Sequence, residues 1–204
     1  MSRVEQAIAA LATLPAIEWV AAALALGYLL LAIRQSPWCW AFSVASALLY
    51  LAVFMRADLY MQAALQLFYV GMAVYGWRTW RGVAGGAPVA ISRWSWQRHL
   101  AALAAVAVVA GINGALVARQ AGGDWVPFVD AAIAWGSVLT TWMVARKIIE
   151  NWLYWVVIDA AMAALAATQG LAVTAALFAL YTALAFRGYW QWRQHERAAL
   201  VQPA

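Results

Sequence analysis

The chain has 204 residues, of which 67% are hydrophobic and only 10% are charged, and its mean hydropathy is +0.75. This composition excludes an ordinary soluble domain and indicates an integral membrane protein. The formal net charge is +5, but the distribution of the basic residues accounts for it without a nucleic-acid partner, and none is expected.

Seven apolar stretches are long enough to cross a bilayer, and lipid offers no partner to unpaired backbone groups, so each is expected to be a helix. In chain order they are Ile17–Ile33, Pro37–Phe54, Leu59–Trp77, Leu100–Val117, Pro127–Ala145, Trp152–Ala167 and Leu171–Phe186. The polar start, with Glu5, argues against a cleaved signal peptide, so the first stretch is a retained span. The sequence predicts an all-α integral membrane protein with seven transmembrane helices in a single membrane domain, residues 1–204.

The basic residues are divided unequally between the two sides of this predicted topology. One side holds Arg3, Arg56 and Arg119. The other side holds Arg34, Arg78, Arg81, Arg93, Arg98, Arg146, Lys147, Arg187, Arg193 and Arg197. Because cytoplasmic loops carry an excess of lysine and arginine, three against ten predicts an outside N-terminus and a cytoplasmic C-terminus.

The sequence also repeats itself when it is shifted by 112 residues without a gap. The shift pairs Pro15 with Pro127, Arg34 with Arg146, Trp40 with Trp152, Tyr69 with Tyr181, Gly76 with Gly188 and Trp80 with Trp192. Four helices separate equivalent points, so both halves enter the membrane in the same direction, as in the parallel repeats of transporters. We predict a 3+1+3 parallel-repeat arrangement: a three-helix repeat over residues 15–80, a linker helix over 97–119 and a second repeat over 127–192.

One acidic residue lies deep within a predicted span. Asp159 follows Glu150 by nine residues, which is about 14 Å along a helix and about half of the hydrocarbon core. An ionisable group at that depth usually faces a water-filled path or a ligand. Trp152, Trp155 and Asp159 share one helical face and can hold a flat cation by stacking and charge. The structural alternatives are an interfacial anchor for Trp152 and a partner on another helix for Asp159.

Signals for catalysis are missing from the sequence. It contains no ATP-binding glycine loop and no convergent nucleophile, metal set or acid–base pair. His99 and His195 lie in basic segments without metal-ligand spacing and are interpreted as solvated, and Cys39 alone permits no internal disulfide. We therefore predict no enzymatic activity, no cofactor and no metal, and keep a non-transporting membrane adaptor as an alternative to a transporter.

Several segments resemble the Pnu family of vitamin transporters. The segment RKIIENWLYWVVID, residues 146–159, is similar to the sixth-helix motif of that family. Further similar segments are Leu59-Tyr60, Leu65-Gln66, Tyr75-Gly76-Trp77, Pro127-Phe128-Val129-Asp130 and Gly170-Leu171. The resemblance extends from about Trp19 to Trp192. It implies a homotrimer in the bacterial inner membrane that imports nicotinamide riboside by facilitated diffusion, with trapping by intracellular phosphorylation.

The resemblance also implies substrate-binding positions. The sixth-helix tryptophans of the family correspond to Trp152 and Trp155, and its third-helix glutamine corresponds to Gln66. Gln66 shares a helical face with Gln62 and Tyr69, and a hydrogen bond to a neighbouring helix is its structural alternative. The candidate substrate-binding residues are Trp152, Trp155, Asp159, Gln66 and Tyr69.

Two departures from the family pattern concern the substrate. Nicotinamide riboside transporters typically have asparagine where this chain has Asp159, and often have asparagine where it has Ala73. The thiamine-importing branch is the alternative, because both vitamins carry a fixed ring cation that a carboxylate suits. Riboflavin, which a further branch uses, lacks that cation and fits Asp159 less well.

Overall fold

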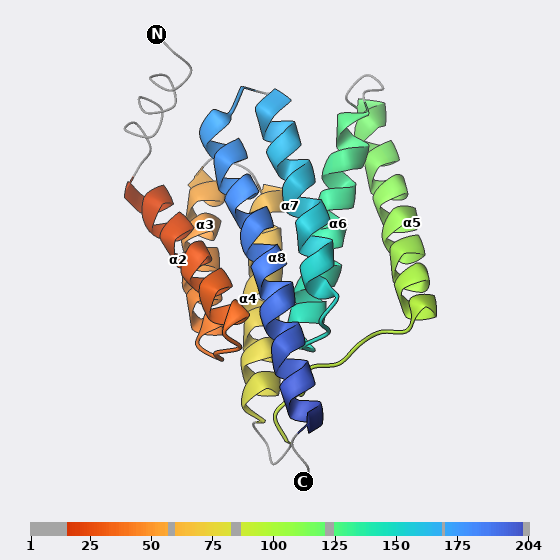
Figure 1. Cartoon of the computed structure of the whole chain (residues 1–204). Helices are drawn as coiled ribbons and strands as arrows, with labels where there is room; N and C mark the ends of the chain where they lie inside the picture. The colour runs from red at the N-terminus through yellow and green to blue at the C-terminus, as the bar shows by residue number, and fades with distance from the viewer. Residues whose placement is uncertain (1–15, 57–59, 83–86, 121–124, 169, 202–204) are drawn as a thin grey trace.

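The computed structural model describes residues 16–56, 60–82, 87–120, 125–168 and 170–201, and within these residues it contains seven α-helices (Figure 1). They are α2 (Ala16–Ile33), α3 (Cys39–Arg56), α4 (Tyr60–Arg81), α5 (Trp96–Gln120), α6 (Val126–Ala145), α7 (Asn151–Thr168) and α8 (Ala172–Val201). The all-α prediction is confirmed, and each predicted span overlaps one helix. Glu5, Arg3, Pro15 and Leu59 lie outside the described residues.

The length and composition of these helices suit a membrane. Among the described residues, α3, α5, α6, α7 and α8 are long and apolar enough to cross one. The apolar part of α2 is the shorter segment Trp19–Ile33. The last turn of α4 carries Arg78 and Arg81, which lower its hydropathy. Five of the seven predicted spans therefore correspond to helices with the length and composition of a membrane span, and α2 and α4 complete the bundle with them.

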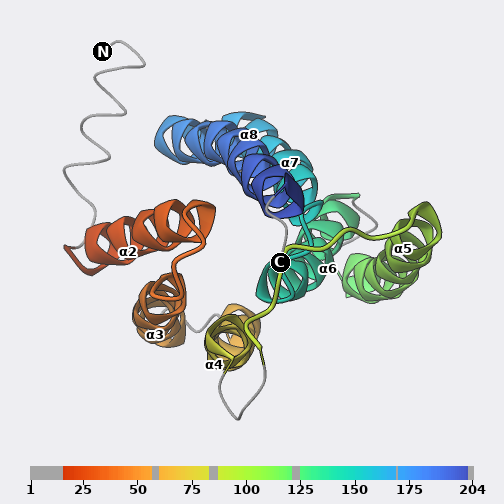
Figure 2. The ribbon, with the colours of Figure 1, turned by 60° about the horizontal axis from the view of Figure 1, so that its bottom comes forward.

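Six of the helices form a ring. Going round it, α2 packs against α3, α3 against α4, α4 against α6, α6 against α7, α7 against α8, and α8 against α2 (Figure 2). Helix α5 lies outside the ring and, among the described helices, packs extensively only on α6. We call α2–α4 the first half of the chain and α6–α8 the second half.

Helix α5 begins earlier than the apolar stretch that predicted it. It starts at Trp96, so that His99 belongs to its first turn, and the His99 Nδ1 atom lies 2.9 Å from the Tyr154 hydroxyl of α7. The interpretation of His99 as a solvated residue is therefore wrong. Its sequence neighbours are polar and basic, and no local pattern shows that α7 supplies a partner.

A cluster of four tryptophans forms the core at one end of the ring. Trp40, Trp80, Trp152 and Trp192 are all buried. The rings of Trp40 and Trp80 meet edge to face with centroids 5.4 Å apart, and those of Trp152 and Trp192 do the same at 5.4 Å. Trp80 and Trp192 join the two pairs at 5.9 Å. Large aromatic rings in such arrangements stabilise a core beyond the area that they bury.

Two glycines allow this cluster to form. A Cβ atom added at Gly76 of α4 would lie 2.2 Å from the Trp40 ring, and one added at Gly188 of α8 would lie 2.6 Å from the Trp152 ring. Neither distance is compatible with a side chain larger than hydrogen. The indoles of α3 and α7 therefore lie directly against the backbones of α4 and α8.

The tryptophans also connect the two halves by hydrogen bonds. The Trp80 indole N–H of α4 donates to the carbonyl oxygens of Val144 (3.3 Å) and Ala145 (3.2 Å), where α6 ends. The Trp192 indole N–H of α8 donates to the carbonyl oxygen of Ala32 (3.0 Å), where α2 ends. Each half thus ties its last helix to the first helix of the other half.

Candidate functional site

Trp152 stands at the start of α7, just after the corner that joins this helix to α6. The residue is only 1% exposed, and its ring lies against Gly188 and Trp192 of α8. An interfacial anchor would be exposed to lipid headgroups, so that alternative does not fit Trp152. The indole N–H has no hydrogen-bond partner among the described residues, although it is buried.

Trp155 and Asp159 continue along the same helix. Trp155 is half-buried and packs against the tryptophan core. Asp159 is 7% exposed and lies close enough to the Tyr181 hydroxyl of α8 to interact with it electrostatically. No basic side chain of the described residues forms an ion pair with Asp159. Of the structural alternative, a partner on another helix, the described residues therefore offer the Tyr181 hydroxyl of α8 but no basic side chain.

Tyr181 also interacts electrostatically with Tyr50 of α3. Helices α3 and α8 are not neighbours in the ring, since α2 lies between them. The interaction between these two tyrosines therefore crosses the interior of the ring. Because Asp159 interacts with the same Tyr181, its carboxylate belongs to this interior polar group.

Gln66 and Tyr69 both lie on α4 and are half-buried. The Tyr69 side chain interacts with the Ser137 hydroxyl of α6 and with Tyr28 of α2. Helices α2 and α4 are separated in the ring by α3, so Tyr69 also points towards the interior. Within the described part of the chain, no hydrogen bond joins the Gln66 side chain to another helix, and the Gln62 side chain lies outside that part.

The predicted site residues thus fall into two sets. Trp152, Trp155 and Asp159 lie on α7, and Gln66 and Tyr69 lie on α4, which α6 separates from α7 in the ring. The structure does not join the two sets by a direct contact. Sequence reasoning missed three further tyrosines of the interior, namely Tyr28, Tyr50 and Tyr181. The available signal was the shift of 112 residues, which pairs Tyr181 with the candidate Tyr69.

The chemistry of this interior is polar. It offers one carboxylate, several phenol hydroxyls and a serine hydroxyl, which can bind charge and hydrogen-bonding groups of a ligand. In the described residues, no three side chains of histidine, cysteine, aspartate or glutamate converge as metal ligands do. The arrangement suits the binding of a polar, flat molecule.

A strap, residues 87–95, crosses one end of the ring between α4 and α5. The Val89 N–H donates to the Thr79 carbonyl oxygen (3.1 Å). The Ser92 N–H donates to the Lys147 carbonyl oxygen, and the Ser92 carbonyl oxygen accepts from the Ile149 N–H, both at 3.0 Å. These bonds hold the strap to both halves of the chain.

An ion pair fixes the strap to α8 as well. The Arg93 guanidinium donates to both carboxylate oxygens of Glu196, at 2.7 and 2.6 Å. Hydrogen bonding to Glu196 raises the pKa of the Arg93 guanidinium above its ordinary value. Bidentate pairs of this kind are geometrically specific, so the strap has a defined position.

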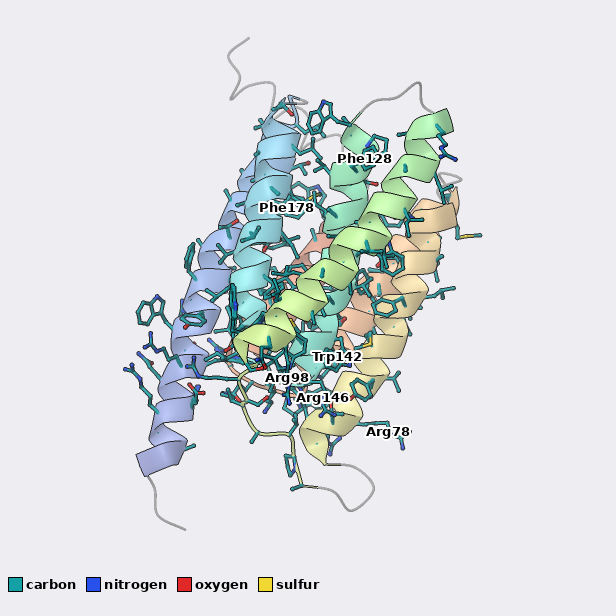
Figure 3. The ribbon with its side chains drawn as sticks, turned by 90° about the vertical axis from the view of Figure 1, so that its right-hand side faces the viewer. Arg78, Arg98, Phe128, Trp142, Arg146 and Phe178 are labelled. Atoms are coloured by element: carbon teal, nitrogen blue, oxygen red, sulfur yellow. The ribbon has the colours of Figure 1, made fainter. Side chains whose placement is uncertain are left out.

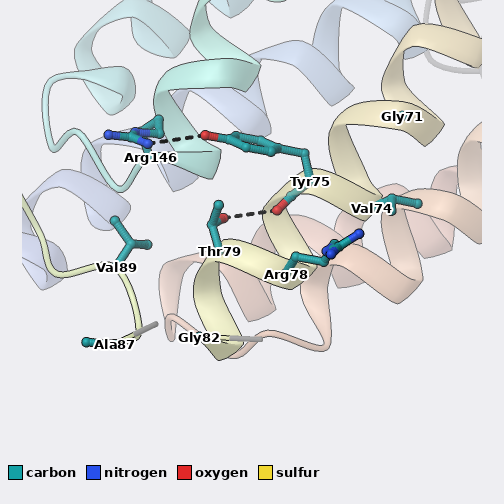
Figure 4. Close-up of a pocket in the computed structure, with 9 residues that line it drawn as sticks. All are labelled: Gly71, Val74, Tyr75, Arg78, Thr79, Gly82, Ala87, Val89 and Arg146. Carbon is teal, nitrogen blue, oxygen red and sulfur yellow. Dashed lines mark hydrogen bonds between the residues drawn. The ribbon is translucent and has the colours of Figure 1, made fainter. Parts of the chain in front are cut away.

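Basic residues gather at the end that the strap covers, which we call the basic end. Arg78, Arg98 and Arg146 all lie there (Figure 3). A cavity of about 640 Å³ between α4, the strap and the end of α6 has Arg78 and Arg146 in its wall. There the Arg146 guanidinium donates to the Tyr75 hydroxyl at 3.3 Å (Figure 4).

Comparisons with known proteins agree with this architecture. Residues 15–194 match the profile of the nicotinamide mononucleotide transporter family. The chain is 29% identical over 172 residues to the riboflavin/roseoflavin transporter RibM of Streptomyces davaonensis. The aligned region covers 83% of this chain and 78% of that protein. It is 26% identical over 176 residues to the nicotinamide riboside transporter PnuC of Escherichia coli strain K12, and this aligned region covers 74% of each chain.

A solved structure has the same fold. The crystal structure of the vitamin B3 transporter PnuC superposes with a TM-score of 0.65 and 19% identity, covering 87% of this chain and 80% of the other. The profile match, which covers most of the chain, shows the family directly. The chain therefore belongs to the nicotinamide mononucleotide transporter family, the Pnu family that its motifs resemble, and is a vitamin transporter rather than an enzyme or an adaptor.

Proposed function

We propose that this protein imports a vitamin with a ring cation across the bacterial inner membrane by facilitated diffusion, and that nicotinamide riboside is its substrate. The observation that carries the proposal is the setting of Asp159. Its carboxylate is buried beside Tyr181 and has no cationic partner among the described residues. A buried carboxylate is costly unless it is paired, and a cationic substrate supplies the missing charge.

The candidate residues have different roles in this proposal. Asp159 forms the ion pair with the ring cation, and Trp155 stacks on the flat ring. A desolvated cation–π contact contributes about 2 kcal/mol. Trp152 forms the wall behind them, where its buried indole N–H can donate to a polar group of the substrate. Gln66 and Tyr69 approach the substrate from α4.

Two other vitamins are alternatives. Thiamine also carries a fixed ring cation, so Asp159 suits it equally well. Riboflavin is favoured by one observation, the 29% identity to the riboflavin/roseoflavin transporter RibM. Aromatic side chains bind any flat ring, so Asp159 is the residue that separates cationic vitamins from riboflavin.

The halves of the ring support the proposed 3+1+3 arrangement, with repeats over residues 15–80 and 127–192 and α5 as the linker helix. Positions 112 residues apart make corresponding contacts: Trp40 on Gly76 and Trp152 on Gly188. The turns that follow α2 and α6 also correspond, because Gln35 (φ 56°) and Lys147 (φ 49°) both adopt a left-handed backbone conformation. We further propose that the protein is a homotrimer and forms a single membrane domain.

The energetics and orientation follow from charge and composition. The sequence contains no ATP-binding glycine loop, so net accumulation depends on a gradient or on chemistry after entry. Of these we propose intracellular phosphorylation of the vitamin. The excess of basic residues at the basic end supports a cytoplasmic location for this end and for the C-terminus.

Uptake by purified protein in vesicles tests the substrate. Labelled nicotinamide riboside, thiamine and riboflavin are offered to the wild type, to Asp159→Asn and to the control Asp130→Asn, which changes an exposed aspartate on α6. We expect saturable uptake of a cationic vitamin that Asp159→Asn weakens and Asp130→Asn leaves unchanged. Uptake of riboflavin alone would contradict the cation argument, and equal effects of both variants would remove the role of Asp159.

A further inference from the structure

An apolar groove runs along the outer face of the bundle between α4, α5 and α6. Its volume is about 350 Å³, and all of its lining residues are apolar. The lining includes Phe68 of α4, Val106 and Val109 of α5, and Trp135 and Leu139 of α6. The groove is therefore suited to a hydrocarbon chain rather than to a polar ligand.

A basic cavity adjoins the groove at the basic end. It has a volume of about 630 Å³ and shares the Trp142 side chain with the groove. On α5 the two are one helical turn apart, since Ala101 lines the cavity and Ala105 lines the groove. Cavity and groove are therefore adjacent and share one wall, and together they offer a basic part and an apolar part.

Two of the three positive charges in this cavity have no anionic partner among the described residues. Three arginines line it, and Arg93 is paired with Glu196. Arg98 and Arg146 are exposed, and no carboxylate of the described residues forms an ion pair with either of them. The hydrogen bond that Arg146 makes within the described residues goes to a neutral phenol, that of Tyr75. Two guanidinium groups without a carboxylate partner in the described part of the chain therefore line the cavity next to the apolar groove.

We propose that the cavity and the groove together bind one anionic phospholipid, with its phosphate between Arg98 and Arg146 and one acyl chain in the groove. Arginine binds phosphate oxygens through its planar set of N–H donors. Arg98 and Val109 are eleven residues apart on α5, or about 16 Å along the helix, which accommodates a large part of an acyl chain. Trp142, 36% exposed, lies between the two parts, as tryptophan does at a membrane interface.

An anionic phospholipid is the ligand that uses both the basic cavity and the apolar groove. Free phosphate would use the arginines but not the groove. A lipid without net charge, such as phosphatidylcholine, carries a quaternary ammonium group beside its phosphate, which the two guanidinium groups repel. A second copy of the chain could cover the groove, but it would not by itself account for the two guanidinium groups beside it. This proposal concerns the outer face of the protein and is independent of the vitamin that passes through the ring.

Native mass spectrometry of the purified full-length protein tests the proposal. The protein is equilibrated with phosphatidylglycerol or phosphatidylcholine, and the lipid that remains bound is counted. We expect retention of one phosphatidylglycerol per chain, in preference to phosphatidylcholine. Each of Arg98→Gln and Arg146→Gln should weaken its binding by roughly fivefold. The matched control is Arg119→Gln, at the other end of α5, which should leave binding unchanged.

A second pair of variants tests the groove itself. Ala105→Trp fills it, whereas Val108→Trp adds the same side chain on an exposed face of α5. Loss of phosphatidylglycerol in Ala105→Trp but not in Val108→Trp supports the acyl-chain position. Equal retention of both lipids, displacement of the lipid by inorganic phosphate at equal concentration, or dissociation of an oligomer by Ala105→Trp with lipid still bound would each overturn the proposal.

Discussion

Trp80 and Trp192 meet with ring centroids 5.9 Å apart, and each donates its indole N–H to the end of a helix in the opposite half. Both residues are buried, so these hydrogen bonds are shielded from water. Separating the two halves at this end would break the hydrogen bonds of both indoles at the same time. We therefore expect the basic end of the ring to be more rigid than the opposite end.

The indole N–H of Trp192 should contribute measurably to stability. Trp192→Phe keeps an aromatic ring but leaves the buried Ala32 carbonyl without its donor, which costs about 1–3 kcal/mol. Trp190→Phe is the control, because Trp190 is 58% exposed. Thermal unfolding of the detergent-solubilised protein should show a lower midpoint for Trp192→Phe alone. Equal midpoints for the two variants would contradict a structural role of this bond.

The glycines beneath the buried indoles provide a second test of the packing. Gly188→Ala places a methyl group 2.6 Å from the Trp152 ring, and this overpacking should cost about 1–3 kcal/mol. Gly71→Ala on α4 is the control, because nothing lies within 4 Å of its added Cβ. Stability in a denaturant titration should fall only for the first variant. A neutral Gly188→Ala would show that Trp152 is free to move.

Substrate protection tests the proposed path through the ring. A cysteine replaces Gln66, or Leu67 as the control, in a chain whose buried Cys39 is changed to alanine. Thiols react as thiolates, which requires water, so Gln66→Cys should react with a small maleimide and be protected by substrate. Leu67 is 58% exposed on the outer face of α4, and its cysteine should be insensitive to substrate. Protection of both positions, or of neither, would remove Gln66 from the path.

The orientation of the chain can be tested with a reporter that is active only in the periplasm. The three-against-ten division of basic residues predicts that a fusion after Ala204 is silent. A second fusion of the same reporter, placed in the segment between α5 and α6, should be active. Strong activity of the C-terminal fusion would reverse the proposed orientation.

Hydropathy alone predicted the helices well, because lipid leaves a membrane-spanning chain few alternatives. The end of α8 was predicted at Phe186, yet the helix continues to Val201, since polar residues such as Gln194 remain helical once the chain leaves the membrane. The depth of Asp159 in the membrane was inferred in the same way and stays a prediction, while its burial among the helices is observed. Its neighbour Tyr181 could not be predicted, because helical periodicity fixes a face of one helix but not which helix it meets.

The tryptophans illustrate the same limit. Trp152 was placed correctly at the start of a helix, but an exposed anchor and a buried core position have the same sequence signature. Only the packing of α8 against α7 shows that the ring is covered. His99 was misinterpreted for the same reason, because its partner Tyr154 is 55 residues away in the chain.

The central claim is passive import of a vitamin that is trapped inside, and uptake by vesicles with and without an enclosed vitamin kinase and ATP tests it most directly. Purified protein should equilibrate labelled nicotinamide riboside to equal inside and outside concentrations in empty vesicles. With the kinase and ATP inside, the label should accumulate far above the outside concentration. Accumulation against a gradient in empty vesicles would contradict facilitated diffusion, and the absence of any protein-dependent uptake of the three vitamins would contradict the proposed function.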